Sequence, residues 1–498
     1  MTKEEAFVVH KDQVDIRNLL PENNSICRLS IKSTHSELEW TILEKQERLR
    51  TLLLIGCKIK PGVALKNFAR LRVLDISSKE SDWLVDSVCE LRHLRYLSFS
   101  NTNISRLPGD IHKMRFLQHI HLQSCTKLEK LPDNITKLAC LRYLNLRGSN
   151  VDVMPRGFGG LTDLRSLHGF PVKMDGDWCT LEELEALSHL RNLSIQGLEN
   201  VSGSSVAKRA KISNKKRLEY LDLKCYKYKD YEVRQIEVEQ QEIIEAVFDE
   251  LCPSPARLET LLIRRYFGRR LPNWLQSPVA TTFKSLKDIT LGHITHSTQL
   301  PDGFCRIHGL ETLRITHAPA IEHVGPDFQT HDGGAAFPNL RKLVWSRLSG
   351  WKLWDWEAES KVIAMPALEY LKLRDCKLPR LPPGLASDHR YNLRIIELVE
   401  LTLLEYVENF PSVVELKVYN CPELKRMSGL SKLRTVHICD CPKLELLEGV
   451  LALDSMELDW EHWEVTGPDA RCTPKAKGYQ QAQDELPREL PQDLVIAR

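Results

Sequence analysis

Leucines recur at a fixed interval in the first third of the chain. The phrase Leu-x-x-Leu-x-Leu, or a close variant of it, begins at Leu94, Leu117 and Leu141, so its copies are 23 and 24 residues apart. In the first copy, Leu97 and Phe99 are two residues apart, which places both side chains on one face of a short strand. The side chains between them point to the other face. Each phrase therefore predicts a short strand with one apolar face.

A leucine pattern with a period of about 20–29 residues is typical of leucine-rich repeats. One coil cannot bury its apolar face alone, so stacked coils bury it against each other and align their strands in a parallel sheet. We predict an α/β fold, a curved leucine-rich-repeat solenoid of about 18 coils. The parallel sheet lines its concave face, and irregular loops and short helices form its convex face. The phrases begin at Ile26, Leu49, Leu71, Leu94, Leu117, Leu141, Leu164, Leu190, Leu218, Leu258, Leu286, Leu310, Leu340, Leu368, Leu393, Val413, Leu433 and Leu453.

Departures from the phrase divide the chain into three parts. Residues 1–22 are charged and do not repeat, residues 23–465 form the repeat domain, and residues 466–498 are polar and are expected to be a disordered tail. The longest interval between phrases predicts an insertion at about 225–256. Its apolar residues between Ile243 and Leu251 have helical spacing, which indicates an amphipathic helix on the convex side. A partner-binding helix is the alternative interpretation.

Three tryptophans, Trp351, Trp354 and Trp356, also fall between phrases. We expect Trp351 in the core of the coil that begins at Leu340 and one of the other two on the surface, because large aromatic side chains usually pack in cores. A ligand-binding aromatic box is the sharper alternative.

Composition excludes several classes of function. The 498 residues include 69 basic and 67 acidic ones, for a net charge of +2, so no global basic excess favours nucleic acid. No run of about 18 apolar residues predicts a membrane span. The first residues lack the basic and apolar regions of a secretion signal, which favours a cytoplasmic or nuclear protein. No arrangement of nucleophile and base, paired carboxylates or phosphate loop predicts an enzyme or a cofactor site.

Several cysteines recur at one position of the phrase, which argues against a set of disulfides. Counting the first residue of each phrase as position one, five of them fall at position nine, where a small side chain turns inward and meets backbone groups left unpaired at the strand end. We therefore predict structural thiols in a reducing compartment. Cys439 and Cys441 resemble a metal pair, but no second Cys or His pair at zinc spacing accompanies them. The position-nine cysteines are Cys57, Cys125, Cys376, Cys421 and Cys441.

Positions two, three and five of each phrase are expected to face the concave groove. Position two carries six arginines in seven consecutive coils, with strands only about 4.8 Å apart, so their charges need an acidic partner or solvent screening. The alternative is that arginine at this position merely keeps the wall soluble. The six are Arg50, Arg72, Arg95, Arg142, Arg165 and Arg191.

Positions three and five of the middle coils carry aromatic, imidazole and amide side chains. Such groups offer contact area at low entropic cost, which suits protein recognition; an ordinary polar wall is the alternative. His119 and His121 could ligate a metal as neighbours on one face, but no third ligand is evident. The residues are Tyr96, His119, His121, Tyr143, Asn145 and His168.

The repeats resemble those of one family. The clauses NISRLPGDIHKMRFLQHIHLQSCTKLEKLPDNITKLACLRYLNL, together with residues 179–201, 210–225 and 243–275, are similar to the repeats of plant intracellular immune receptors. These are the nucleotide-binding leucine-rich-repeat disease resistance proteins, in the coiled-coil class common in grasses. The similarity covers nearly the whole chain, from about Lys3 to Trp460.

The resemblance implies a protein-binding module in effector recognition and autoinhibition during the defence response. Implied partners are the receptor's nucleotide-binding (NB-ARC) switch domain, in the same chain or in another one, and a pathogen effector or guarded host protein. The switch's Gly-x-x-x-x-Gly-Lys-Ser/Thr loop and Met-His-Asp motif do not occur here. MTKEEAFVV resembles the sequence that follows that motif, so we expect the chain to begin just past the switch. A non-immune intracellular scaffold or adaptor is the alternative function.

Overall fold

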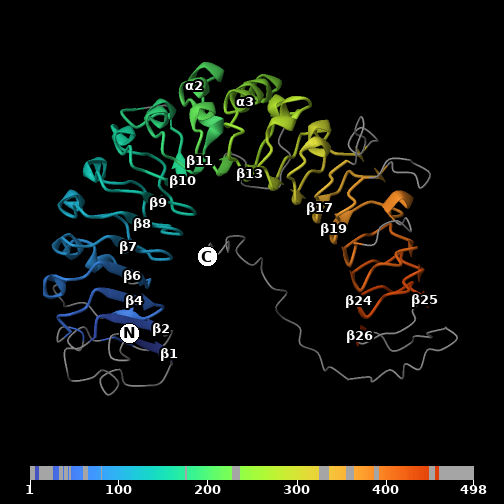
Figure 1. The fold of residues 1–498 in the computed structure, drawn as a ribbon, viewed down its shortest axis with the longest axis horizontal. Helices are drawn as coiled ribbons and strands as arrows, with labels where there is room; N and C mark the ends of the chain where they lie inside the picture. The colour runs from blue at the N-terminus through green and yellow to red at the C-terminus, as the bar shows by residue number, and fades with distance from the viewer. Residues whose placement is uncertain are drawn as a thin grey trace.

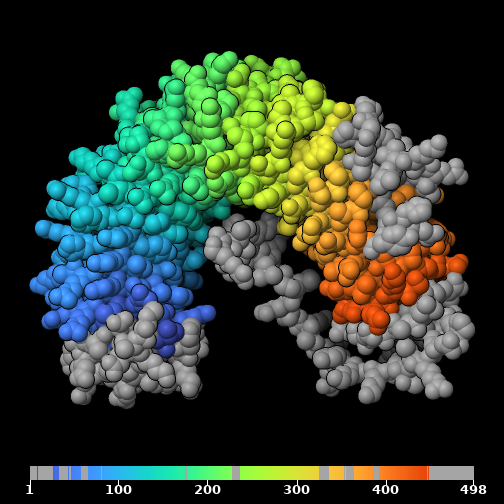
Figure 2. All heavy atoms as spheres, in the orientation of Figure 1, coloured from blue at the N-terminus to red at the C-terminus, as the bar shows by residue number. Residues whose placement is uncertain are grey.

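The computed structural model describes residues 6–10, 26–32, 37–38, 43, 46–59, 65–79, 81–173, 176–226, 236–324, 336–354, 364–385, 392–447 and 455–458. The chain forms an arch with the strands of the main sheet along its inner side (Figure 1). Helices α2 (Ser204–Arg209) and α3 (Val238–Glu250) lie on the outer side. The described residues follow the arch in chain order (Figure 2). The predicted horseshoe is confirmed.

The inner wall is a 19-stranded sheet whose neighbouring strands are parallel. One strand begins at position three of each phrase, and one more strand precedes the first phrase. Its members are β1 (Ala6–His10), β2 (Arg28–Lys32), β4 (Thr51–Ile55), β6 (Val73–Ser77), β7 (Tyr96–Ser98), β8 (His119–His121), β9 (Tyr143–Asn145), β10 (Ser166–Pro171), β11 (Asn192–Gln196), β12 (Tyr220–Lys224), β13 (Thr260–Arg264), β14 (Asp288–Gly292), β15 (Thr312–Thr316), β17 (Lys342–Leu348), β19 (Tyr370–Cys376), β20 (Ile395–Val399), β22 (Glu415–Tyr419), β24 (Thr435–Cys439) and β26 (Ser455–Leu458).

Short elements form the rest of each coil, and no described helix is long and apolar enough to cross a bilayer. Small parallel sheets pair β3 (Glu37–Leu38) with β5 (Lys58–Ile59), β16 (His323–Val324) with β18 (Leu353–Trp354), and β21 (Tyr406–Glu408) with β23 (Arg426–Ser428) and β25 (Leu446–Leu447). The 3-10 helices are Leu65–Phe68, Asp82–Leu84, Ser87–Glu90, Ile111–Lys113, Asp133–Lys137, Phe158–Gly160, Leu181–Ala186, Leu198–Asn200, Ile212–Asn214, Asn273–Leu275, Val279–Thr282, Asp302–Arg306 and Pro383–Leu385.

Burial alternates along strands such as β4, β6 and β13, as the phrase predicts, whereas β10 is buried throughout. Leu144 and Leu146 have no exposed surface, whereas Tyr143, between Arg142 and Leu144, is half-buried. Its strand β9 pairs in register with β8 and β10, so equivalent positions of successive coils lie side by side. The predicted strand phase is therefore confirmed.

The sheet begins earlier than the sequence indicated. Residues 1–22 were expected to lie outside the repeat, but β1 pairs in parallel with β2 along its whole length, with Phe7 opposite Leu29 and Val9 opposite Ile31. That expectation is wrong for Ala6–His10. The strand lacks the leucines of the phrase. Only the two-residue spacing of Phe7 and Val9 matches the pattern of the later strands. The tail from Thr466 lies outside the described residues.

Two rows of backbone hydrogen bonds join successive coils. At position two, each N–H donates to the position-two carbonyl of the preceding coil, as from Arg72 to Arg50 at 2.8 Å and from Arg165 to Arg142 at 2.8 Å. At position eight the backbone is left-handed in most coils; His293, for example, has a φ of 56° and donates its N–H to a carbonyl of the next coil at 2.7 Å. These rows tie the coils together where each strand begins and ends.

The position-nine cysteines occupy the place that the phrase predicts. All five are buried and free of disulfides. The Cys125 thiol donates to the Phe99 carbonyl at 3.0 Å, and the Cys57 thiol lies 3.6 Å from the Ile31 carbonyl. Each accepting carbonyl belongs to position six of the preceding coil. Burial raises the pKa of the Cys376 thiol to about 12, so this thiol is unreactive at neutral pH.

The insertion and the tryptophans both contribute to the core. Helix α3 lies in the expected insertion and buries Ile244, Val247 and Phe248. Trp351 is fully buried and packs edge-on against the Trp345 ring, with 4.7 Å between centroids. Trp354, in the short strand β18, is also buried. The expected core position of Trp351 is confirmed, and Trp356 lies outside the described residues.

Replacing Leu144 by arginine tests the stacking of coils. The substitution places an unpaired charge inside a coil that has no room for it, and we expect the free energy of unfolding to fall by about 4 kcal/mol or more. Because each coil contacts only its neighbours, the loss should appear as local unfolding around β9. Urea unfolding followed by circular dichroism, with limited proteolysis, measures both effects.

Tyr143→Ala is the matched control on the opposite face of β9. The Tyr143 ring is half-buried and stacks on His121, so we expect a loss of only about 1 kcal/mol. Equal losses from the two variants would contradict the assigned strand phase.

Candidate functional site

The arginine stripe (Arg50, Arg72, Arg95, Arg142, Arg165 and Arg191) follows one rim of the groove. Each of its side chains is exposed. With Gln118 between Arg95 and Arg142, the stripe follows the unbroken row of position-two hydrogen bonds, so the spacing between coils holds its members close together. The structure thus places all six arginines together, as the phrase predicted; whether they contact a partner stays a prediction.

The sign of the charge along this rim changes in the middle of the arch. From Glu219 onward, acidic and basic residues share position two and pair with each other: Arg191 with Glu219 at 3.5 Å, and Lys287 with Glu259 at 3.1 Å. By contrast, no carboxylate in the described part of the chain forms an ion pair with the first five arginines of the stripe. The N-terminal half of the rim therefore carries an uncompensated positive charge, whereas the following coils largely neutralise themselves.

Six rings form a continuous cluster on the floor of the groove (Tyr96, His119, His121, Tyr143, His168 and Tyr220). His121 stacks on Tyr143 with 4.4 Å between centroids and lies 4.8 Å from Tyr96. Tyr143 in turn lies 5.5 Å from His168, whose ring meets Tyr220 edge-on at 5.9 Å. The structure brings together the aromatic and imidazole residues that the sequence singled out, and adds Tyr220.

Burial keeps the imidazoles of this cluster neutral. It lowers the pKa of His121 to about 4, with a smaller contribution from neighbouring His119. Burial, followed by the positive charge of Arg147, lowers the pKa of His168 to about 3. Burial also raises the pKa of Tyr96 to about 12. At neutral pH the ring cluster is therefore an uncharged surface beside a charged rim.

His168 is more deeply buried than the other two histidines because its strand is irregular. The pairing of β10 with β11 shifts between Leu167 and Phe170, at Gly169. Gly169 has a φ of 81°, and a Cβ at this position would lie 3.0 Å from the Leu146 backbone. This bulge leaves His168 only 8% exposed, between Tyr143 and Tyr220.

A buried polar network that the sequence did not predict adjoins the ring cluster. Asp222 has no exposed surface; it accepts a hydrogen bond from Ser194 Oγ at 2.8 Å and two from the Arg264 guanidinium. Arg147 lies 4.0 Å from the same carboxylate and donates to Tyr220 Oη at 2.5 Å. Ser194 and Asp222 occupy position five of their coils, and Arg147 and Arg264 occupy position seven, so the period of the phrase could have identified them as neighbours on the sheet. Nothing in the phrase indicates that their side chains contact each other.

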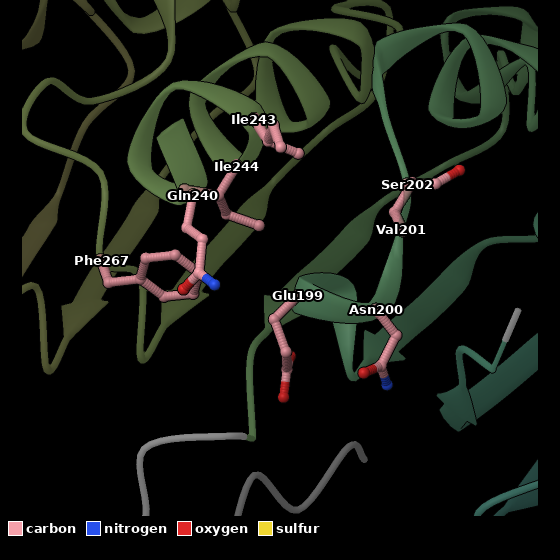
Figure 3. Close-up of a pocket in the computed structure, with 8 residues that line it drawn as sticks. All are labelled: Glu199, Asn200, Val201, Ser202, Gln240, Ile243, Ile244 and Phe267. Carbon is pink, nitrogen blue, oxygen red and sulfur yellow. The ribbon is translucent and has the colours of Figure 1, made fainter. Parts of the chain in front are cut away.

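A hollow outside the groove lies beside α3. It measures about 240 Å³ and separates Glu199 and Asn200, of the 3-10 helix Leu198–Asn200, from Ile243 and Ile244 of α3 (Figure 3). Its lining is mixed, and Phe267 closes one side. Within the described ranges, no group of three or more His, Cys, Asp or Glu side chains could hold a metal ion.

Comparison with known proteins agrees with this geometry. A family profile described as "Leucine-rich repeat region" matches residues 48–412, most of the chain. The chain belongs to this leucine-rich-repeat family.

Three relatives of this leucine-rich-repeat chain bear disease-resistance names. One Arabidopsis thaliana protein is 30% identical over 73% of this chain and 24% of its own length. An RPP13-like protein of the same plant is 28% identical over 84% of this chain and 44% of its own. RGA2 of Solanum bulbocastanum is 29% identical over 73% and 36%. The chain thus spans less than half the length of these relatives, and the resemblance to plant disease resistance proteins is confirmed.

Solved structures match this leucine-rich-repeat chain only distantly. A leucine-rich-repeat protein of Leptospira interrogans covers 90% of it at 16% identity, with a TM-score of 0.48 and 95% of its own chain aligned. A similarity of this size carries no argument about function.

The buried imidazoles predict that the repeat domain loses stability in mild acid. The pKa values of His121 and His168 lie below the value of about 6.5 expected in the unfolded chain, so the unfolded chain binds more protons below that pH. The free energy of unfolding should therefore fall as pH drops from about 6.5 toward 4, by roughly 1 kcal/mol for each imidazole after solvent screening.

The variant His121→Gln with His168→Gln isolates this contribution. We expect it to lose less stability than the natural sequence between pH 7 and pH 5, in urea titrations at both pH values. His189→Gln, on an exposed turn, is the control and should follow the natural sequence. An unchanged difference between the two pH values in the double variant would contradict the assignment.

Proposed function

We propose that this chain is the recognition and autoinhibition module of a plant disease resistance protein and acts by binding proteins, not by catalysis. The observation that carries the proposal is the uncompensated charge of the arginine stripe, which occurs on a repeat domain whose relatives bear disease-resistance names. A cytoplasmic or nuclear location belongs to the same proposal.

The stripe suits an acidic protein surface. The first five arginines of the stripe are exposed on one rim and form no ion pair with a carboxylate of the described residues, so they attract a partner of opposite charge and repel basic proteins. In a complete receptor this partner is the nucleotide-binding switch domain, held inactive by the contact. Binding of an effector would then compete with the contact and release the switch.

The ring cluster suits the second task, recognition. It lies on the floor of the groove, next to the stripe, and all of its rings except His168 are only partly buried. Aromatic and neutral imidazole rings offer contact area with few rotatable bonds, as recognition surfaces commonly do. An effector or a guarded host protein that enters the groove would therefore reach both the cluster and the stripe.

Charge reversal within the stripe tests the autoinhibitory contact. We expect Arg95→Glu with Arg142→Glu to weaken association with a co-expressed nucleotide-binding switch domain of a related receptor by roughly tenfold or more, because like charges then face each other. Co-precipitation and titration by surface plasmon resonance at two salt concentrations measure the effect. The natural chain should bind less well at the higher salt.

The matched control reverses two arginines of the same rim near the other end of the arch. Arg394→Glu with Arg434→Glu changes the net charge equally and should leave association within twofold. If both double variants bind equally well, the arginines of the stripe only keep the surface of the groove soluble, and the proposed contact is wrong.

A further inference from the structure

We propose that Arg147 and the adjoining tyrosines form a subsite that binds a side-chain carboxylate of an acidic, aromatic segment of a partner protein. This proposal rests on the proposed function only in taking the groove to be a protein-binding surface. It concerns position seven, at the opposite end of the strands from the arginine stripe.

Arg147 is the surplus cation of the polar network. The two oxygens of Asp222 already receive hydrogen bonds from Arg264 and Ser194, so Arg147, at 4.0 Å, has only a weak share of that carboxylate. One carboxylate thus serves two guanidinium groups. A second carboxylate would complete the charge balance of the network, because an arginine pairs best with a carboxylate of its own.

The hydrogen-bonding capacity of Arg147 is also incompletely used. One terminal nitrogen donates to Tyr220 Oη at 2.5 Å, and the guanidinium stacks 5.1 Å from the centre of the Tyr220 ring. Its Nε is buried without a hydrogen-bond partner in the described part of the chain, as are His168 Nδ1 and Gln196 Nε2. Buried polar nitrogens without partners are rare and costly in folded proteins, so a site that gathers several of them in neighbouring coils suits a polar ligand.

A partner can reach this residue from the groove. The side chain of Arg147 is 21% exposed, whereas that of Asp222 is fully covered, so an incoming carboxylate meets the cation and not the anion. The half-buried rings of Tyr143 and Tyr220 flank the approach. The site therefore combines a charge for a carboxylate with faces for an apolar or aromatic side chain.

The charges around Arg147 favour a segment with several acidic side chains over a single terminal carboxylate. Position seven and the stripe are five residues apart along each strand, or about 16 Å at roughly 3.3 Å per residue. The floor of the groove thus has cations on both rims, with Arg142 and Arg165 on one side and Arg147 on the other, and neutral rings between them. A segment that alternates carboxylates with aromatic side chains matches this order of charge, ring and charge.

Titration calorimetry with two peptides tests the subsite. The probe is acetyl-Glu-Tyr-Glu-Tyr-Glu-amide, and its neutral counterpart has Gln in place of Glu. We expect the natural chain to bind the probe and to bind the neutral peptide at least about tenfold more weakly, since charge-assisted hydrogen bonds are lost. No binding at about 1 mM probe, or equal binding of both peptides, would overturn the proposal.

Two variants of the network have opposite expected effects. Arg147→Met keeps the aliphatic part of the side chain and removes the charge, so the probe should bind about tenfold more weakly. Tyr220→Phe removes the hydroxyl that occupies Arg147 and should leave binding equal or tighter. If both variants lose binding equally while remaining folded by circular dichroism, Arg147 is only a structural brace and the subsite is wrong.

Further controls separate the remaining interpretations. Arg156→Met removes an exposed arginine that pairs with Asp177 outside the network, and should leave probe affinity within twofold. A peptide with Gln side chains and a free terminal carboxylate should bind weakly; binding as tight as that of the probe would overturn the assignment to a side-chain carboxylate.

The proposed immune function is judged by a different measurement. A chain that binds the probe through Arg147 but ignores the switch domain would refute the immune proposal alone. A chain that binds the switch domain but not the probe would refute the subsite alone.

Discussion

Each coil of this arch has an apolar face and unpaired backbone groups that only the next coil can cover. The position-two and position-eight hydrogen bonds, and the thiols at position nine, all run from one coil to its neighbour. The fold therefore depends on unbroken stacking, and it tolerates additions only where they do not interrupt it. Helix α3 lies on the outer side, where it does not interrupt the stacking of the strands. Its buried apolar residues extend the core that the coils form.

The same stacking decides where charge can accumulate. Side chains at one position of successive coils are held about 4.8 Å apart, so a row of equal charges cannot spread out to relieve repulsion. The second half of the arch avoids this cost with pairs such as Lys287 and Glu259. The first half retains the cost in the arginine stripe, and this retained charge is the basis of the autoinhibitory contact proposed above.

At the centre of the groove, polar groups are buried in a sheet that leaves them little freedom to move. Asp222 is fully covered and depends on Arg264 and Ser194 for its hydrogen bonds. Arg147 and the neutral imidazole of His168 lie beside it without comparable partners. This contrast, within one network, distinguishes side chains that stabilise the fold from those available to a ligand.

The sequence by itself determined the repeat, the strand phase and the exposed position of the arginine stripe, because a fixed period converts position in the phrase into direction in space. It missed β1, whose residues Ala6–His10 lack the leucines. Only the tertiary structure decided that Arg147 meets Tyr220, which is 73 residues away, and that both lie beside Asp222. Such contacts depend on side-chain reach across several coils and on the bulge at Gly169, and neither is encoded in the period.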